Sequence, residues 1–375
     1  MKRVRSPEAQ AAEQARKKLA RPKWRTSQRT LNKDGQIISE QQRRVPTLVP
    51  VEIPNGRTKF TTTIYDAEGL PARQFVRVEP EKAGGEAAWA SLFEAMSQRF
   101  ERPAPLQAPP AGLLTNADLL TTYPVGDHHL GMLSWAPETG ADYDLNISQQ
   151  LFLAAMDNLV ERSPLTDTAL IPILGDFFHY DSFKAITPEH RNLLDSDTRY
   201  PKMIEAGYKI VRRAIDLALM KHQQVWVICE IGNHDEASSV HFAIALRQIY
   251  ENEPRVHVDT SPRNCHYFRF GSVLLGTTHG DKLKLPDLPL TMATDMPVEW
   301  GETQYRYWYT GHRHNDRVLE VMGTHVEQFG ILAPSDAYNR NAGYRAGRSM
   351  KAITYHKDYG EVSRLIVNPM MLEKK

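Results

Sequence analysis

The sequence predicts an α/β fold for most of the chain, on the strength of two observations. Beyond residue 112, short apolar runs of strand length alternate with longer stretches whose apolar residues recur at steps of three and four. Strands that alternate with amphipathic helices are typical of α/β proteins. A proline-rich stretch over residues 102–111 separates this region from the first hundred residues. We therefore expect a small amino-terminal module and one large α/β domain.

The amino-terminal fifty residues are strongly basic. They contain 13 Lys and Arg residues but only 4 Asp and Glu residues, in a chain with 46 and 45 of these in total. Such an imbalance indicates contact with a polyanion such as DNA, and a solvated tail is the simpler alternative. We assign residues 1–27 to a basic tail that is either disordered or in contact with phosphates.

Residues 28–100 are predicted to form a small module of hairpins and one helix, with nucleic-acid binding as its expected role. Thr30–Val45 and Thr63–Val78 each place an acidic residue and a glycine between strand-like ends, which is typical of β-hairpins. A helical pattern follows over Glu86–Phe100. The proline-rich linker at 101–112 then leads to the α/β domain at 113–375.

Within the α/β domain, strands and helices are predicted from the period of the apolar residues. The predicted strands are Ala169–Leu174, Val225–Cys229, Val273–Thr277 and Arg306–Thr310. The predicted helices are Ser148–Arg162, Pro201–Lys221 and Val240–Tyr250. Pro201 suits the first turn of its helix because proline has no backbone N–H to leave unpaired there.

Five polar clusters follow apolar, strand-like runs. They are Asp127-His128-His129, Gly175-Asp176, Gly232-Asn233-His234-Asp235, His279-Gly280-Asp281 and Gly311-His312-Arg313-His314. The carboxyl ends of strands in an open α/β sheet meet at one crevice, so side chains distant in sequence can converge there. Imidazole, amide and carboxylate groups without a thiolate favour Mn²⁺, Fe or Zn²⁺ over Mg²⁺ or Ca²⁺. The clusters therefore predict a metal site.

In this order, the clusters resemble the calcineurin-like metallophosphoesterases, whose pattern is D-x-H, G-D, G-N-H-[DE], H and G-H-x-H. The resemblance implies a four-layer α/β/β/α sandwich with two divalent ions, for which we expect Mn²⁺, with Fe or Zn²⁺ as alternatives. It implies that one ion is held by Asp127, His129 and His314, the other by Asn233, His279 and His312, and that Asp176 bridges them.

The same resemblance implies a hydrolase that acts on phosphate esters. A hydroxide activated by the two metals would attack phosphorus, since the ions lower the pKa of water and neutralise charge on the phosphate oxygens. His234 would stabilise the phosphate or protonate the leaving oxygen, and Asp235 would hold the second ring nitrogen of His234.

The amino-acid sequence around these motifs is most similar to that of the SbcD-type DNA repair nucleases. The strings that carry this resemblance are Asp127–Gly131, Gly175–His179 and Gly232–Asp235. It implies that His179 helps to position a nucleic-acid substrate, although a loop histidine bonded to a neighbour is an equal alternative. We expect a DNA nuclease with exonuclease activity. The alternatives are a phosphomonoesterase or small (cyclic) nucleotide phosphodiesterase, and a non-catalytic binding protein on this fold.

The chain also resembles phosphoesterases encoded by bacteriophages and prophages, in that the predicted catalytic domain lies late in the sequence. Among residues near the last motif, Arg313, Tyr344, Arg345 and Arg348 are candidates for binding substrate, because Arg binds phosphate bidentately and Tyr stacks on bases. Ordinary surface positions are the alternative for these four residues.

The departures from the repair nucleases limit what the resemblance implies about partners. Little chain follows His314, so we expect neither their capping domain nor their ATPase partner, and the oligomeric state is left open, a homodimer included. Two cysteines provide no disulfide framework, which fits the cytoplasm, or the host cytoplasm for a phage protein. No apolar run approaches the roughly 18 residues that a membrane crossing needs, so no membrane contact is expected.

Overall fold

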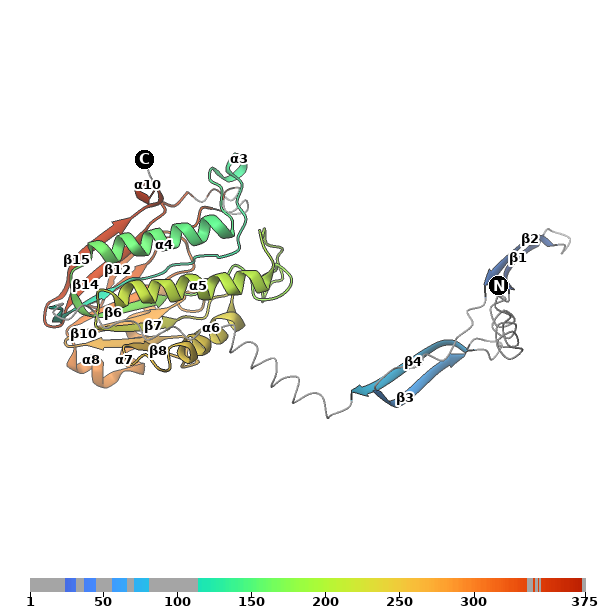
Figure 1. Ribbon diagram of the computed structural model, residues 1–375, viewed down its shortest axis with the longest axis horizontal. Coiled ribbons are helices and arrows are strands. Elements are labelled where there is room, and N and C mark those ends of the chain that lie inside the picture. The colour runs from blue at the N-terminus through green and yellow to red at the C-terminus, as the bar shows by residue number, and fades with distance from the viewer. Residues whose placement is uncertain are drawn as a thin grey trace, which may run out of the picture. The chain divides into compact units, whose positions relative to one another are not determined.

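The computed structural model describes residues 24–31, 37–44, 56–65, 71–80, 114–335, 340, 343 and 345–372. The chain divides into two compact units, Met1–Glu101 and Arg102–Lys375, which are described separately (Figure 1). The helix predicted over Glu86–Phe100 and the linker at 101–112 lie outside the described residues. Among the described residues, no helix has both the length and the apolar character that crossing a membrane requires.

The first unit contains two antiparallel hairpins. β1 (Trp24–Leu31) pairs with β2 (Ile37–Arg44), and β3 (Gly56–Tyr65) pairs with β4 (Pro71–Pro80). Both hairpins overlap the predicted segments Thr30–Val45 and Thr63–Val78, but β1 and β3 begin before them, at Trp24 and Gly56. β1 nevertheless begins at Trp24, inside the segment that the sequence assigns to a tail. Aromatic and β-branched residues such as Trp24 and Thr26 favour strands. Residues 1–27 were assigned to a tail because they contain many basic residues, and this strand preference was not considered.

Two β-sheets form the centre of the second unit. The larger sheet has the strand order β15-β14-β5-β6-β7-β8, in which β5 to β8 run parallel and β14 and β15 run antiparallel to their neighbours. Its strands are β5 (Asn116–Thr122), β6 (Thr166–Ile173), β7 (Gln224–Cys229), β8 (Val256–Val258), β14 (Met350–His356) and β15 (Gly360–Val367). The strands predicted at Ala169–Leu174 and Val225–Cys229 are confirmed as β6 and β7.

The smaller sheet has the strand order β12-β13-β11-β10-β9. Its strands are β9 (His266–Phe270), β10 (Val273–Thr278), β11 (Tyr305–Thr310), β12 (Arg317–Val321) and β13 (Thr324–Gln328). β10, β11 and β13 are parallel, whereas β9 and β12 are antiparallel edge strands. The strands predicted at Val273–Thr277 and Arg306–Thr310 are confirmed as β10 and β11.

The three predicted helices are present with shifted ends. They are α4 (Leu145–Arg162), α5 (Tyr200–Leu219) and α6 (Glu236–Ile249). α4 begins three residues earlier than predicted because Asp144 caps it, with its Oδ1 accepting from the backbone N–H of Ile147 at 2.7 Å. Shorter helices are α3 (Ala136–Thr139), α7 (Leu288–Asp295), α8 (Pro297–Glu302), α10 (Pro369–Leu372) and the 3₁₀ turn η1 (Leu285–Asp287).

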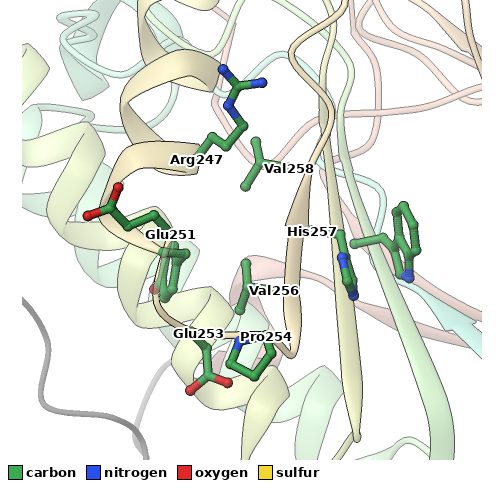
Figure 2. A pocket seen from close by; sticks show the side chains of 9 residues that line it. Arg247, Glu251, Glu253, Pro254, Val256, His257 and Val258 are labelled. Atoms are coloured by element: carbon green, nitrogen blue, oxygen red, sulfur yellow. The ribbon is translucent and has the colours of Figure 1, made fainter.

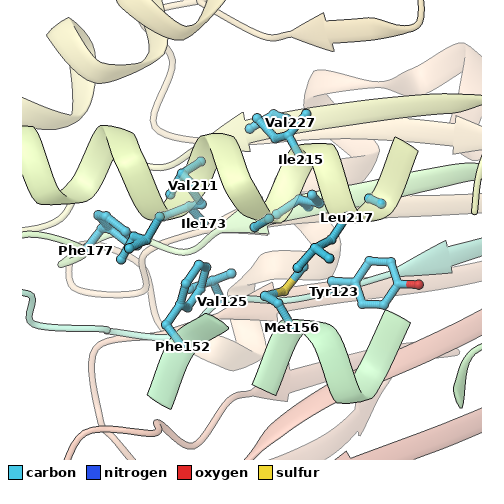
Figure 3. Packing of buried hydrophobic residues seen from close by; sticks show 14 of the residues in the cluster. Tyr123, Val125, Phe152, Met156, Ile173, Phe177, Val211, Ile215, Leu217 and Val227 are labelled. Carbon is cyan, nitrogen blue, oxygen red and sulfur yellow. The ribbon is translucent and has the colours of Figure 1, made fainter. Parts of the chain in front are cut away.

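Most of the buried apolar side chains belong to three clusters, which lie between the four layers formed by the helices and the two sheets. Alternate residues of β6 face opposite sides: Ile171 packs against α4 and α5, while Leu170 packs against the smaller sheet. Figure 3 shows the first cluster, where Phe152 of α4 and Val211 of α5 lie over the larger sheet. In the smaller sheet, Trp308 faces α7. The second unit is therefore a four-layer α/β/β/α sandwich, as expected.

Candidate metal centre

The predicted ligands lie on loops that follow parallel strands of both sheets. In the larger sheet these are the loops after β5, β6 and β7, and in the smaller sheet the loops after β10 and β11. The loops after β5 and β6 continue side by side, since the backbone N–H of His129 donates to the carbonyl of Asp176 at 3.0 Å. The carboxyl ends of the two sheets therefore converge, and so do their polar side chains.

The first group of side chains consists of Asp127, His129 and His314, each offering one ligand atom within 4.8 Å of the others. Nε2 of His314 lies 3.0 Å from Nε2 of His129 and 3.1 Å from Oδ2 of Asp127. Both oxygens of Asp127 accept from the backbone N–H of His312, at 2.9 and 3.0 Å. Asp127 is fully buried, whereas the side chain of His314 is 27% exposed.

The second group consists of Asp176, His279 and His312, whose ligand atoms also lie within 4.8 Å of one another. Nε2 of His279 lies 3.3 Å from Oδ2 of Asp176 and 2.9 Å from Oδ1 of Asn233. Burial holds the pKa of His129, in the first group, well below its usual value, while the nearby negative charge of Asp176 acts in the opposite direction and raises it. All seven predicted ligands are thus brought to one end of the sandwich.

The donor atoms of these groups fit a cation. Nδ1 of His279 lies 2.8 Å from the carbonyl oxygen of Leu174 and donates to it, and Nε2 faces the oxygens of Asp176 and Asn233. Burial acts to lower the pKa of His279, but the charge and hydrogen bond of Asp176 raise it well above its usual value, so a positive charge is stabilised at Nε2. That charge is either a proton or a metal ion, and an imidazole, amide and carboxylate set is what Mn²⁺, Fe and Zn²⁺ bind.

The ligand loops have an unusual backbone conformation. Four of the ligands have positive φ angles, at 47° for His129, 48° for Asp176, 71° for His312 and 56° for His314. Such angles are uncommon for residues with a side chain and cluster at functional sites. Gly232 permits one of the close approaches, because a Cβ there would overlap the main chain and carboxylate of Asp176.

The role predicted for Asp235 is wrong in one respect. Its carboxylate does not hold the ring of His234; it accepts from the backbone N–H groups of Asp176 at 3.1 Å, Phe178 at 3.0 Å and Gly232 at 3.2 Å. Burial, followed by the negative charge of Asp176, raises the pKa of Asp235 to about 7. Asp235 therefore ties the two ligand loops together.

His234 is held by a different acceptor. Its Nδ1 lies 2.8 Å from the carbonyl oxygen of His179, so it donates there and leaves Nε2 on the opposite side of the ring. The ring is half-buried and its centroid lies 4.9 Å from that of His129. His234 is thus beside the first ligand group, in a position suited to a phosphate or a leaving oxygen.

The prediction that His179 positions substrate does not agree with its burial. The residue is 1% exposed, and its Nδ1 lies 3.2 Å from Nδ1 of His129. Burial, and then the charge of His234, lower its pKa to about 3. The alternative, a loop histidine bonded to a neighbour, describes His179 better, because the side chain faces a ligand and not solvent.

The candidate substrate-binding residues are only partly brought to the site. Arg313 is exposed between two ligands. Arg345 is exposed and donates to the carbonyl of Arg340 at 2.8 Å, while Arg348 is half-buried and donates from Nε to the carbonyl of Leu332 at 2.7 Å. Tyr344 lies outside the described residues. Their roles in substrate binding remain predictions.

An ion-pair network around a buried lysine, next to the last ligand loop, was missed from the sequence. Lys351 is 6% exposed, and its Nζ lies 2.9 Å from Asp316 and 2.8 Å from Glu327. Asp316 also accepts from the backbone N–H of Gly330 at 2.7 Å, so the loop after His314 is fixed to β13 and β14. A single lysine inside the apolar strand β14 is the sequence signal that could have revealed it.

A surface pocket of about 410 Å³ lies away from these residues (Figure 2). It is formed between the end of α6 and β8, with Arg247, Glu251 and His257 among its lining residues. It contains none of the predicted ligands. The pocket is therefore separate from the candidate metal centre.

Comparison with known proteins gives weak similarities. No protein-family model and no curated protein matches the chain. A predicted phosphoesterase from Streptococcus pneumoniae is 11% identical, with 66% of this chain and 98% of that chain covered and a TM-score of 0.27. Vps29 complexed with zinc, from Entamoeba histolytica, is 15% identical, covering 66% and 99%, with a TM-score of 0.30.

TM-scores this low support no assignment by themselves. The assignment rests on the molecule itself: two mixed sheets packed face to face, helices on both outer faces, and clustered His and Asp side chains at the end of the sandwich. The second unit is a four-layer α/β/β/α sandwich with side-chain clusters able to bind metal ions at one end.

Proposed function

We propose that the protein is a metal-dependent phosphoesterase that hydrolyses phosphodiester bonds in DNA. The observation that carries the proposal is the meeting of two His/Asp groups at the end of the sandwich, with His234 beside them. We assign two divalent ions to these groups, Mn²⁺ in preference to Fe or Zn²⁺, with Asp176 shared between them. When bound, the ions would activate water and neutralise charge on the phosphate.

The side chains of the protein have separate roles in this proposal. In its imidazolium form, His234 would keep Nδ1–H on the carbonyl of His179 and donate the second proton, on Nε2, to the leaving oxygen, which leaves the ring neutral. Asp235 would keep the loops of Asp176 and Gly232 in register. Arg313, exposed between His312 and His314, would contact a phosphate next to the scissile one.

Two features of the sequence support DNA as the substrate. One is the set of strings similar to SbcD-type nucleases, and the other is the basic amino-terminal segment with 13 basic and 4 acidic side chains in fifty residues. A basic segment would add phosphate contacts remote from the site, which raise affinity for a polymer and make it salt-dependent.

A phosphomonoesterase or small-nucleotide phosphodiesterase is the second candidate. The burial of His179 favours it, because that histidine was the only site residue that pointed specifically to a nuclease. Both candidates use the same ligands and His234. They differ in whether the basic amino-terminal segment contributes to turnover.

The test is hydrolysis by the purified full chain with Mn²⁺, against single-stranded DNA, duplex DNA, cyclic nucleotides, p-nitrophenyl phosphate and bis-p-nitrophenyl phosphate. We expect DNA hydrolysis that EDTA abolishes. Neutralising Arg16, Lys17, Lys18 and Arg21 should lower kcat/KM on DNA by about tenfold or more at low salt and leave bis-p-nitrophenyl phosphate unaffected. Lys209→Gln with Arg213→Gln, exposed on α5, is the control. Inertness toward DNA beside rapid monoester hydrolysis would favour the second candidate.

A further inference from the structure

The inner face of the site contains a histidine with no assigned chemical task. His179 is 1% exposed and follows β6 in the loop that carries Asp176. Its backbone N–H donates to the carbonyl of Leu130 at 3.0 Å, and the N–H of Leu130 donates to Phe177 at 2.8 Å. The main chain therefore sets its position beside His129, independently of its side chain.

The two rings meet through like atoms. Nδ1 of His179 lies 3.2 Å from Nδ1 of His129, and the rings are nearly perpendicular, at 81°. A hydrogen bond between two imidazole nitrogens requires a proton on one and a lone pair on the other. The direction of this bond decides the tautomer of His129, because a neutral ring carries a single N–H.

Only one of the two directions of this hydrogen bond leaves His129 able to bind a metal ion through Nε2. If His179 donated, the proton of His129 would be on Nε2, the atom that lies 3.0 Å from Nε2 of His314. If His129 donates from Nδ1, its Nε2 lone pair points to the space shared with Asp127 and His314. A metal ligand usually has its other ring nitrogen fixed in this way by an acceptor.

We propose that His179 is a positioning residue that accepts a hydrogen bond from Nδ1–H of His129, and so holds His129 in the tautomer that binds the ion. This inference rests on the proposed function for the existence of the ion. It gives His179 a task toward the metal in place of a contact with substrate. The ring of His234 stacks on that of His179, with centroids 5.6 Å apart. His234 is half-buried, whereas His179 is buried.

The test compares two replacements of similar size. His179→Asn keeps an acceptor oxygen near the position of Nδ1, whereas His179→Leu removes it. We expect His179→Leu to weaken the ion held by Asp127, His129 and His314 by about 10- to 100-fold. His179→Asn should stay within about threefold of the wild type. The ion held by His279 and His312 should be unaffected in both, which also shows that the variants are folded.

The measurement is Mn²⁺ content by equilibrium dialysis of the full chain, without any substrate, over a range of free Mn²⁺. His190→Leu, an exposed position of the same segment, is the control. Unchanged Mn²⁺ binding in His179→Leu overturns the inference, and so does equal weakening in His179→Leu and His179→Asn. If the wild type leaves DNA intact but shows the expected Mn²⁺ pattern, the DNA proposal fails and the inference stands.

Discussion

Two buried histidines in the same domain have opposite surroundings. His222, at the amino end of β7, has an oxygen partner at each ring nitrogen: the hydroxyl of Tyr123 at 2.9 Å, and the hydroxyl and carbonyl of Thr166 at 2.8 and 2.9 Å. His129, at the carboxyl end of β5, faces imidazole nitrogens on both sides, at 3.0 and 3.2 Å. Both rings are buried, at 0% and 3% exposure.

The difference lies in the partner and not in the burial. Hydroxyl and carbonyl oxygens satisfy a neutral imidazole, so His222 needs nothing more and is a structural residue. At His129, the proposed proton on Nδ1 satisfies the contact with His179, whereas Nε2 faces His314 and the carboxylate of Asp127, a set of atoms that a cation satisfies. Burial alone would assign both histidines to the core, whereas the partners separate them. The following predictions test that separation.

The largest effect is expected for Asp176→Asn. This change removes a negative charge from the second ligand group and from the vicinity of His129, so both ions should bind weakly. Activity should fall roughly 1,000-fold or more, because the ions supply most of the activation of water. Mn²⁺ content and turnover are measured together, with the exposed Asp157→Asn as control. Retained turnover would contradict the proposed bridging role of Asp176.

A smaller effect on activity, and none on metal content, is expected for His234→Gln. His234 is not one of the seven predicted ligands, and its Nε2 would be the proton donor of the proposed reaction. Turnover should fall about 100- to 1,000-fold, which lies within the range that general acids usually contribute. Mn²⁺ content should equal that of the wild type and of the exposed control His241→Gln. Loss of an ion would make His234 a ligand.

The smallest effect is expected for the structural histidine and concerns stability. Burial lowers the pKa of His222 from 6.5 to about 4. The unfolded chain therefore takes up a proton first as the pH falls, and stability present above pH 6.5 is lost between 6.5 and about 4. This loss amounts to about 3 kcal/mol at most, from the shift in pKa.

Urea unfolding between pH 7 and pH 4.5 measures this contribution. His222→Gln should be less stable than the wild type at pH 7, and the gap should narrow as the pH falls. His241→Gln, on the exposed face of α6, should follow the wild type throughout. A gap that stays constant over this range would show that His222 is not held neutral by the fold.

The strands and the clustering of the polar side chains were predictable for the same reason. Strands β6, β7, β10 and β11 are rich in apolar residues, and each is followed by a polar cluster, so the sequence indicated both the strand ends and the side chains that meet there. The strands at the end of the chain were not predicted. Only Gly360 and Val367, at the two ends of β15, are buried, and polar residues such as Glu361, Ser363 and Arg364 lie between them, so its apolar pattern is weak without its partner β14.

The roles of individual polar side chains were harder to predict. Asp235 follows His234 in sequence, which suggested a bond between their side chains, but the chain turns there and the carboxylate points to the loop of Asp176. His179 was assigned to substrate because sequence similarity does not report which way a loop side chain faces. Lys351 was overlooked because its partners, Asp316 and Glu327, lie on other elements.

The positive φ angles at His129, Asp176, His312 and His314 oppose the side chains that these positions carry. Each left-handed residue with a side chain costs stability of about 1 kcal/mol, which glycine would recover in the same conformation. Glycine at these positions would therefore favour the folded backbone while removing a possible metal ligand. The backbone and the chemistry of the site thus favour different residues at the same four positions.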